Sequence, residues 1–277
     1  MNDLNGKVAV VTGGGSGIGR GIALAMADAG MDVVVADIDL KAAESVAFEV
    51  AERNVRSLAH EVDVTQRDEV ERLAERAYGE FEFVHLLCNN AGVTTFGMMG
   101  TDVRDEDWRW VLSVNLDGVI NGIQAFLPRM QAQAGEKHVV NTASIAGVHP
   151  SPIIAPYVAS KYAVVGISET LRMEGGGAKI SCSVLCPGNV KTDIVYSQRN
   201  RQEAFGEPVE INPMIEKTIE DGLDPLWVGR MVRQAVIDDE LYIFTHPDTR
   251  EPVEARFGAI RAGFDWADRQ TRENEPG

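Results

Sequence analysis

The stretch Lys7–Gly19, KVAVVTGGGSGIG, decides how the rest of the chain is interpreted. A short apolar run ends at three glycines, and a helical pattern over Ile18–Ala29 follows directly. Glycines tolerate positive φ and let backbone N–H groups approach a phosphate closely, while a helix N-terminus adds favourable partial charge. The order of strand, glycine-rich turn and helix therefore predicts a phosphate cradle. The strict GxGxxG spacing is absent, so this loop alone leaves the function open.

Apolar strand-like runs and helical patterns alternate outward from this stretch. The expected strands are Lys7–Thr12, Asp32–Asp37, one within Val55–Val64, Val84–Asn89, Lys137–Thr142, Lys179–Cys186 and Glu240–Thr245. The expected helices are Ile18–Ala29, Lys41–Arg53, Arg67–Tyr78, Asp105–Gln133 and Pro156–Glu174. Buried strands that alternate with helices predict an α/β fold: a single Rossmann-like, doubly wound parallel sheet of about seven strands with helices on both faces.

No linker divides the chain, so residues 1–277 are predicted to form a single dinucleotide-binding and catalytic domain. The segment 189–224 is polar and irregular, and Gly206, Pro208, Pro213 and Gly222 interrupt it. Long irregular insertions are commonly functional lids or simply mobile, and the position of this one favours a substrate lid. Residues 246–277 form a C-terminal extension whose sequence predicts no role.

The composition excludes several partners. A formal net charge of −16 over 277 residues disfavours binding to nucleic acid and to anionic membranes. The three cysteines form no CxxC pair, and the five histidines have no metal-ligand spacing, so we expect buried thiols and no metal. The first residues lack the pattern of a signal peptide, and no apolar run reaches transmembrane length, so the expected location is cytoplasmic.

Asp37 ends the second predicted strand, 18 residues after Gly19. A carboxylate in that position can accept hydrogen bonds from the adenine-ribose hydroxyls of NAD, and it would repel the 2′-phosphate of NADP. Asp39 is a competing candidate, and a turn or capping role is the alternative for either residue. Neither Ser16 nor Ile38 is basic, so the local sequence offers no cation to a 2′-phosphate.

Further motifs follow in order along the chain. They are Thr12–Gly19 (TGGGSGIG), Asp63-Val64, Asn89-Asn90-Ala91-Gly92, then Asn115, Ser144, Tyr157 and Lys161, and finally Pro187-Gly188 with Thr192. Each motif is weak alone, but their order and spacing together make the chain resemble the main branch of the short-chain dehydrogenase/reductase family. The resemblance covers Gly6 to about Thr192 and resumes weakly at Glu240–Thr245.

This resemblance implies roles for individual residues. The catalytic set would be Asn115, Ser144, Tyr157 and Lys161. NAD would contact Gly13, Ser16, Gly17, Ile18, Gly19, Asp37, Ile38, Asp63, Val64, Asn90, Ala91, Gly92, Tyr157, Lys161, Pro187, Gly188, Val190 and Thr192. In this family the equivalent of Asn115 bends its helix and holds a water in a proton relay, and the two long helices pair across two-fold axes. A homotetramer, or a homodimer, is therefore implied.

The chemistry of these residue types fits that assignment. Tyr157 and Lys161 lie four residues apart on a predicted helix, so both side chains share one face. A nearby ammonium group, with the positive nicotinamide ring, favours the phenolate of a tyrosine whose ordinary pKa lies near 10. Ser144, 13 residues before Tyr157, can hydrogen-bond the oxygen on which charge develops.

Three functions remain open at this point. The substrate pocket is expected between Val93–Met99, Ile145–Ile154 and the insertion after Thr192, and its apolar content favours a bulky hydrophobic or aromatic secondary alcohol or ketone. No arginine lies near Ser144 or Tyr157 in sequence, which slightly disfavours a carboxylate substrate, but Arg199 and Arg201 in the insertion keep that alternative open. A sugar or polyol dehydrogenase of the same fold is the first alternative. A dinucleotide-binding regulator without turnover is the second, and the complete catalytic set argues against it.

Overall fold

The computed structural model describes residues 1, 3–207 and 221–274. Seven parallel strands form one sheet in the order β3-β2-β1-β4-β5-β6-β7. They are β1 Val8–Thr12, β2 Asp32–Asp37, β3 Ser57–Glu61, β4 Leu86–Asn89, β5 Lys137–Thr142, β6 Ile180–Cys186 and β7 Tyr242–Phe244. The strand order reverses between β1 and β4, which confirms the predicted doubly wound sheet. In such sheets a ligand binds beyond the carboxyl ends of the strands at the point of reversal.

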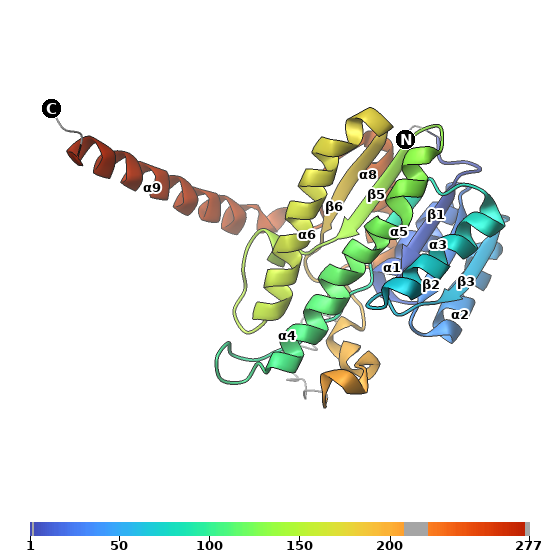
Figure 1. Ribbon diagram of the computed structural model, residues 1–277, viewed down its shortest axis with the longest axis horizontal. Helices are drawn as coiled ribbons and strands as arrows, with labels where there is room; N and C mark the ends of the chain where they lie inside the picture. The colour runs from blue at the N-terminus through green and yellow to red at the C-terminus, as the bar shows by residue number, and fades with distance from the viewer. Residues whose placement is uncertain (2, 208–220, 275–277) are drawn as a thin grey trace.

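Helices cover both faces of the sheet (Figure 1). They are α1 Gly17–Ala27, α2 Leu40–Ala51, α3 Arg67–Phe81, α4 Asp105–Leu112, α5 Gly118–Ala132, α6 Ala155–Glu174, α8 Pro225–Asp238 and α9 Arg250–Asn274. Short 3₁₀ turns occupy Ile145–Gly147, Gly175–Ala178, Ile194–Asn200, Glu203–Phe205 and Pro247–Thr249. Pro208 and Pro213 of the predicted lid lie outside the described residues.

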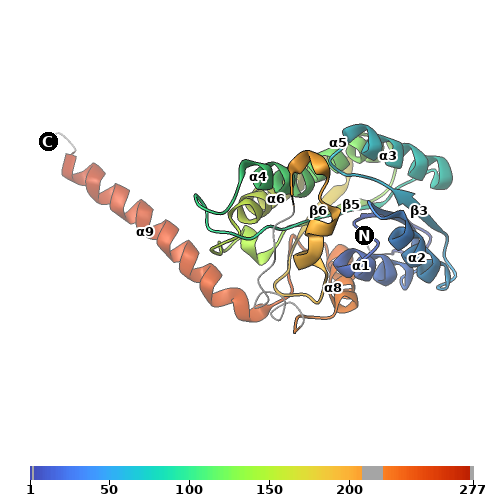
Figure 2. The same ribbon diagram turned by 90° about the horizontal axis from the view of Figure 1, so that it is seen from below.

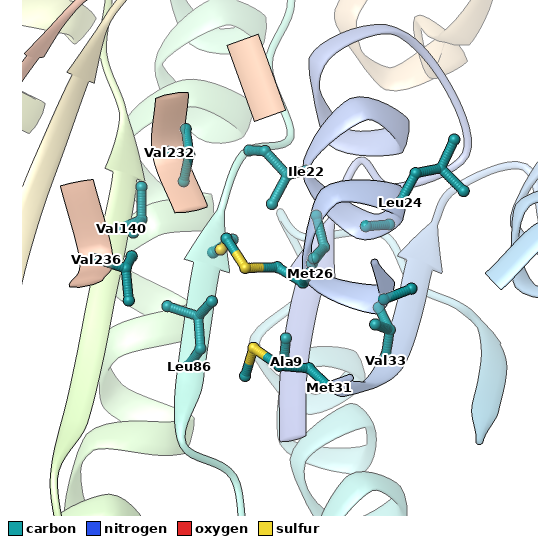
Figure 3. Close-up of a cluster of buried hydrophobic side chains, with 14 of the residues drawn as sticks. Ala9, Ile22, Leu24, Met26, Met31, Val33, Leu86, Val140, Val232 and Val236 are labelled. Carbon is teal, nitrogen blue, oxygen red and sulfur yellow. The ribbon is translucent and has the colours of Figure 1, made fainter. Parts of the chain in front are cut away.

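The core consists of two apolar layers, one on each side of the sheet. On one side α1, α2 and α8 pack against the strands, and Figure 3 shows Met26 and Val236 meeting Leu86 and Val140 there. On the other side α3, α4 and α5 cover the sheet, with Trp110 and Phe126 fully buried. Every side chain of β1 is buried, which explains why the strand beside the glycine loop is almost entirely apolar.

Helix α8, which the sequence analysis did not predict, packs directly against α1. A Cβ atom added at Gly21 would lie 2.0 Å from the carbonyl oxygen of Pro225, and one added at Gly229 would lie 2.0 Å from that of Gly21. Only glycine at both positions permits this distance between the two helix backbones. The contact fixes the end of the chain's irregular insertion against the helix that follows the phosphate loop.

The predicted helix Asp105–Gln133 is interrupted. It consists of α4, a π-helical segment Ser113–Asp117, and α5. The interruption surrounds Asn115, whose side chain hydrogen-bonds the backbone of Val93 instead of solvent. A π-helical turn inside a helix often marks a functional position. The structure therefore divides the predicted helix Asp105–Gln133 into two, and the interruption lies at the residue that the resemblance expected to bend it.

Helix α9 projects away from the body of the molecule (Figures 1 and 2). Its first turns are attached through Val253 and through Arg256, whose guanidinium lies 5.0 Å from the ring centroid of Tyr162 on α6. Residues 259–272 are all exposed, including Phe264 and Trp266. Across the described residues, no helix combines the length and the apolar character needed to cross a membrane.

Candidate active site

A cavity that is open to solvent lies at the carboxyl ends of the strands. It extends from Asp37 at the end of β2 to Tyr157 and Lys161 on α6. The fold therefore places one elongated site across the point where the strand order reverses. Most residues assigned to it from the sequence line this cavity: Gly13, Ser16, Gly17, Ile18, Asp37, Ile38, Asp63, Val64, Asn90, Ala91, Gly92, Tyr157, Lys161, Pro187 and Thr192.

The glycine loop is shaped to hold an anion. Gly13 and Gly17 adopt φ values of +61° and +48°, which L-residues with side chains rarely adopt. A Cβ atom at Gly13 would lie 2.8 Å from the Cα of Ala91, and one at Gly17 would lie 2.9 Å from the side chain of Thr192. Among the described residues, the Ser16 side chain caps no N–H group of α1, which leaves the helix N-terminus facing the cavity.

The structure separates the roles of the two aspartates after β2. Asp39 is the N-cap of α2, and its carboxylate accepts hydrogen bonds from the N–H groups of Lys41 and Ala42. Asp37 lines the cavity, where its Oδ2 accepts a hydrogen bond of 2.9 Å from the Gly15 N–H. Asp37 is therefore the residue of this pair that can reach a ligand in the cavity.

The motif after β4 braces the loop after β1. The Nδ2 of Asn90 donates to the carbonyl oxygens of Thr12 and Gly13 at 3.0 and 3.2 Å. The hydroxyl of Thr12 accepts from the N–H groups of Asn90 and Ala91. These bonds hold β1 and β4 together at the edge where the site begins.

Tyr157 and Ser144 meet at the other end of the cavity. Burial raises the pKa of Tyr157, and a hydrogen bond with Ser144 acts in the opposite direction. The Ser144 hydroxyl also lies 3.4 Å from the carbonyl oxygen of Pro187 and accepts from the Ala146 N–H. In the absence of a ligand, Tyr157 is therefore held in its protonated form at neutral pH.

The Lys161 side chain is buried, and it pairs with no carboxylate among the described residues. Its Nζ donates to the carbonyl oxygen of Thr142 at 2.8 Å and lies 5.4 Å from the ring centroid of Tyr157. Burial lowers the pKa of Lys161 to about 8. The neighbouring Cys186 is a neutral thiol, since burial raises its pKa to about 12. The described residues therefore provide no opposite charge next to Lys161, and only a bound ligand could supply one.

Asn115 is completely buried behind the cavity wall, and Ser144 does not itself line the cavity but hydrogen-bonds Tyr157, which does. The Asn115 Oδ1 accepts from the Val93 N–H at 2.8 Å, and its Nδ2 donates to the Val93 carbonyl and to the Ser160 hydroxyl. Gly92 lies between this amide and Lys161: a Cβ there would be 3.4 Å from the Asn115 Oδ1 and 3.5 Å from the Lys161 Nζ. Asn115 therefore holds the backbone of Val93, which lines the cavity beside Gly92.

Three further residues that were predicted to contact NAD do not line the cavity. Gly19 packs behind the glycine loop, where a Cβ atom would lie 2.0 Å from the Gly13 carbonyl oxygen. Val190 is buried in the apolar layer below α1 and α8. Gly188 donates its N–H to the Nδ1 of His246 at 3.1 Å. His246 thus fixes the turn that follows Pro187.

Sequence reasoning missed the residues that hold the insertion over the cavity. Arg201 and Asp107 of α4 form an ion pair of 2.6 Å with both side chains almost completely buried. The Arg201 guanidinium also donates to the Phe205 carbonyl and lies 5.0 Å from the ring centroid of Trp110. Arg201 is therefore engaged within the protein, whereas Arg199 lines the cavity. Sequence periodicity carries no signal for a contact between residues this far apart.

The fold and this site define the class of protein: an α/β protein with a doubly wound sheet, in which the half-buried Tyr157 and the buried Lys161 line a cavity at the carboxyl ends of the strands. Residues 7–203 match the family described as short chain dehydrogenase, so the chain belongs to that family.

Individual proteins are similar over almost the whole chain. The C alpha-dehydrogenase of Sphingobium sp. (strain NBRC 103272 / SYK-6) is 34% identical over 94% of this chain and 87% of its own length. The cyclohexanol dehydrogenase of Acinetobacter sp. (strain SE19) is 32% identical over 79% of this chain and 90% of its own length. A short chain dehydrogenase/reductase from Burkholderia phymatum, solved in complex with NAD, is 35% identical with a TM-score of 0.90, covering 95% of this chain and 97% of that one.

Proposed function

We propose that this protein is an NAD-dependent dehydrogenase that oxidises a bulky hydrophobic or aromatic secondary alcohol to a ketone, or catalyses the reverse reduction. The observation that carries the proposal is the single cavity that joins Asp37 at one end to Tyr157 and Lys161 at the other. The similar proteins from Sphingobium and Acinetobacter, whose names specify dehydrogenases, support an alcohol or ketone as substrate.

The residues of the cavity fit a dinucleotide. Glycines leave the space that a Cβ would fill at Gly13 and Gly17, and the N-terminus of α1 faces it. Asp37 offers a carboxylate to ribose hydroxyls, and Arg20, the cation that directly follows the glycine loop, pairs with Glu49 at 2.9 Å instead. This arrangement favours NAD over NADP, because a 2′-phosphate would face an anion.

Bound NAD would supply the acceptor for the hydride that leaves the alcohol carbon. Tyr157, as phenolate, takes the hydroxyl proton while the carbon–hydrogen bond breaks, and the products are the ketone, NADH and the neutral tyrosine. Ser144 hydrogen-bonds the substrate oxygen. The Lys161 ammonium lies 5.4 Å from the Tyr157 ring centroid, and together with the positive ring of bound NAD it would favour the phenolate over the neutral tyrosine.

The substrate region is where three segments meet. Gly97 donates its N–H to the Ile153 carbonyl, and the Thr94 N–H donates to the Ser197 hydroxyl. Val93 and Ile194 line the cavity, whereas Met98 and Met99 are exposed beside it. We propose that the segment 189–224 closes over the bound substrate, and that the exposed apolar side chains then contact it.

Turnover and substrate class are tested together. The purified protein is assayed by absorbance for NADH formation with hydrophobic secondary alcohols and with sugars and polyols. Preference for the hydrophobic alcohols supports the proposal, and preference for polyols would assign the alternative of the same fold. Binding of NAD without any turnover would instead favour a regulator.

We also propose that the chain assembles as a homotetramer or homodimer through α4–α5 and α6. Light scattering at micromolar concentration measures the mass in solution. A monomeric mass would contradict this proposal and leave the catalytic one standing.

A further inference from the structure

Arg199 lies in the cavity wall, in the short 3₁₀ segment Ile194–Asn200. The described residues that line the cavity include only one other basic side chain, that of Lys161, which is buried and donates to a backbone carbonyl. Arg199 is therefore the only solvent-accessible cation that these residues offer to an anionic ligand. Three carboxylates line the same cavity, those of Asp37, Asp63 and Asp193.

Arg199 is only weakly engaged within the protein. Its Nη1 donates to the Asp193 carbonyl oxygen at 3.2 Å, and its Nη2 lies 3.8 Å from the carboxylate of the same residue. The two side chains are 47% and 65% exposed, so water screens their attraction. Arg201 differs, because its ion pair with Asp107 is almost completely buried. A guanidinium has five N–H donors, and the contacts with Asp193 leave some of them to a ligand.

The backbone on both sides of Arg199 is held. On the amino-terminal side, the Ser197 hydroxyl accepts from the Thr94 N–H at 3.1 Å. On the carboxyl-terminal side, the Gln202 side chain donates a hydrogen bond of 2.8 Å to the Asp63 carboxylate. The Arg199 side chain therefore extends from a fixed backbone, and only its own torsions need to change for the guanidinium to turn toward a ligand.

The guanidinium lies close to the glycine loop. A Cβ atom at Gly17 would be 2.9 Å from the Thr192 side chain, which places Thr192 against the first residue of α1. The carbonyl group that Arg199 contacts belongs to Asp193, the next residue along the chain. Gly17 and Ile18 line the cavity at the N-terminus of α1, where N–H groups favour an anion. An oxyanion bound there would be a neighbour of the Arg199 side chain.

We propose that Arg199 is an anion-binding residue of the insertion: its guanidinium leaves Asp193 and pairs with an oxyanion of a ligand in the cavity. This inference rests on the proposed function, which offers two sources of the oxyanion, the pyrophosphate of the dinucleotide and a carboxylate on the substrate. Arginine can bind either of them through two parallel N–H···O bonds. The cation also offsets the repulsion between the cavity carboxylates and an anionic ligand. Its position near Gly17 favours the pyrophosphate.

Binding measurements test the pyrophosphate as the source. Isothermal titration calorimetry gives the Kd of NAD and of ADP-ribose, and competition against NAD gives that of adenosine, which has no phosphate. Arg199→Gln should weaken NAD and ADP-ribose about 10-fold, the low end for a charged hydrogen bond because the guanidinium is half exposed, and should leave adenosine unchanged. The difference from the wild type should shrink as the salt concentration rises. Arg199→Lys keeps the charge without the paired donors and should give an intermediate Kd.

A second titration tests the substrate as the source. The complex with NAD is titrated with acetophenone and with 4-acetylbenzoate, two ketones that differ by one carboxylate and that NAD cannot oxidise. If Arg199→Gln weakens 4-acetylbenzoate alone and leaves both dinucleotides unchanged, the proposal holds with the substrate carboxylate as the partner.

Arg230→Gln is the matched control, because it removes the same charge from an exposed residue of α8 that does not line the cavity. Its Kd values should equal those of the wild type, and thermal unfolding checks that every variant is folded. Unchanged Kd values of NAD, ADP-ribose and 4-acetylbenzoate in Arg199→Gln would overturn the proposal. Equal weakening of adenosine would overturn it too, since Arg199 would then act through the shape of the cavity. A wild type that binds neither dinucleotide would overturn the proposed function as well.

Discussion

The two ends of the cavity are built differently. At the end beside β2, Asp37 is exposed to the cavity and is held by the N–H groups of the glycine loop and of its own turn. At the other end, Lys161 is buried and donates to the Thr142 carbonyl, and the half-buried Tyr157 is held by Ser144. One end presents a carboxylate held by backbone N–H groups, and the other alters the pKa values of its groups by burial.

This difference separates binding from chemistry. A positioned carboxylate selects a ligand by hydrogen bonding and repulsion, so changes there should alter cofactor affinity and leave the proton transfer intact. Tyr157 acts through its shifted pKa, so loss of its hydroxyl should alter turnover and leave the affinity for NAD almost unchanged. The following variants test this separation.

The largest effect is expected at the catalytic end. Tyr157→Phe removes the proton-transfer group and should lower turnover by about 10²- to 10⁴-fold, the range for one acid–base group. The Kd of NAD, measured by calorimetry, should stay close to that of the wild type. Tyr162→Phe on the same helix is the control and should keep its turnover. A Tyr157→Phe enzyme with near-normal turnover removes Tyr157 from the mechanism.

The stability of the protein should depend on the buried ion pair by which Arg201 anchors the insertion to Asp107 of α4. Arg201→Met leaves Asp107 without one of its two cationic partners in a buried site, and we expect a loss of about 3 kcal/mol in the free energy of unfolding, measured with urea. Arg104→Met removes the other, half-exposed partner and should cost below about 1 kcal/mol. Equal losses in the two variants would contradict the anchoring role of Arg201.

The preference for NAD over NADP should respond to substitutions at the Asp37 end of the cavity alone. We expect the wild type to prefer NAD over NADP by about 10²-fold in kcat/KM, equivalent to about 2.7 kcal/mol. Asp37→Ser should weaken NAD and remove the repulsion of the 2′-phosphate, and Asp37→Ser with Ile38→Arg should draw NADP in, because arginine pairs with phosphate.

Asp39→Ser is the matched control for cofactor choice. It replaces one capping residue of α2 by another, so the preference for NAD should persist. A wild type that prefers NADP would show that the assignment of Asp37 is wrong.

The smallest effect is a shift in pH dependence. Alcohol oxidation needs the phenolate of Tyr157, so kcat/KM should rise as the pH passes the pKa of that group. The hydrogen bond from Ser144 lowers the pKa of Tyr157, and Ser144→Ala should therefore move this rise to higher pH, besides reducing the rate. A profile that shifts to lower pH would show that Ser144 stabilises the neutral tyrosine instead.

Much of the fold was predictable because its signals are local. The strand Asp32–Asp37 was predicted with the bounds that the structure gives it, since a short apolar run between two aspartates leaves few alternatives. Helix α8 was missed because it follows the irregular segment and begins at Pro225, which interrupts a sequence pattern although proline is well suited to the first turn of a helix.

The site was predictable only in part. The family resemblance assigned Tyr157, Lys161 and the glycine loop to one site, and all of them line the same cavity. It also assigned Val190 as an NAD contact, but the structure buries Val190 in the core. Gln202 and His246 gave no signal, because their partners Asp63 and Gly188 lie far away along the chain. Only long-range packing brings such pairs together.

The sequence by itself determined the doubly wound sheet, the glycine loop after the first strand and the tyrosine–lysine spacing, because periodicity and glycine placement act over a few neighbouring residues. The tertiary structure decided which aspartate faces the cavity, that Arg201 is engaged with Asp107, and that burial lowers the pKa of Lys161 to about 8. Charge, solvation and hydrogen-bond partners at each of these groups depend on segments that are distant in sequence, and a pattern of neighbouring residues cannot contain them.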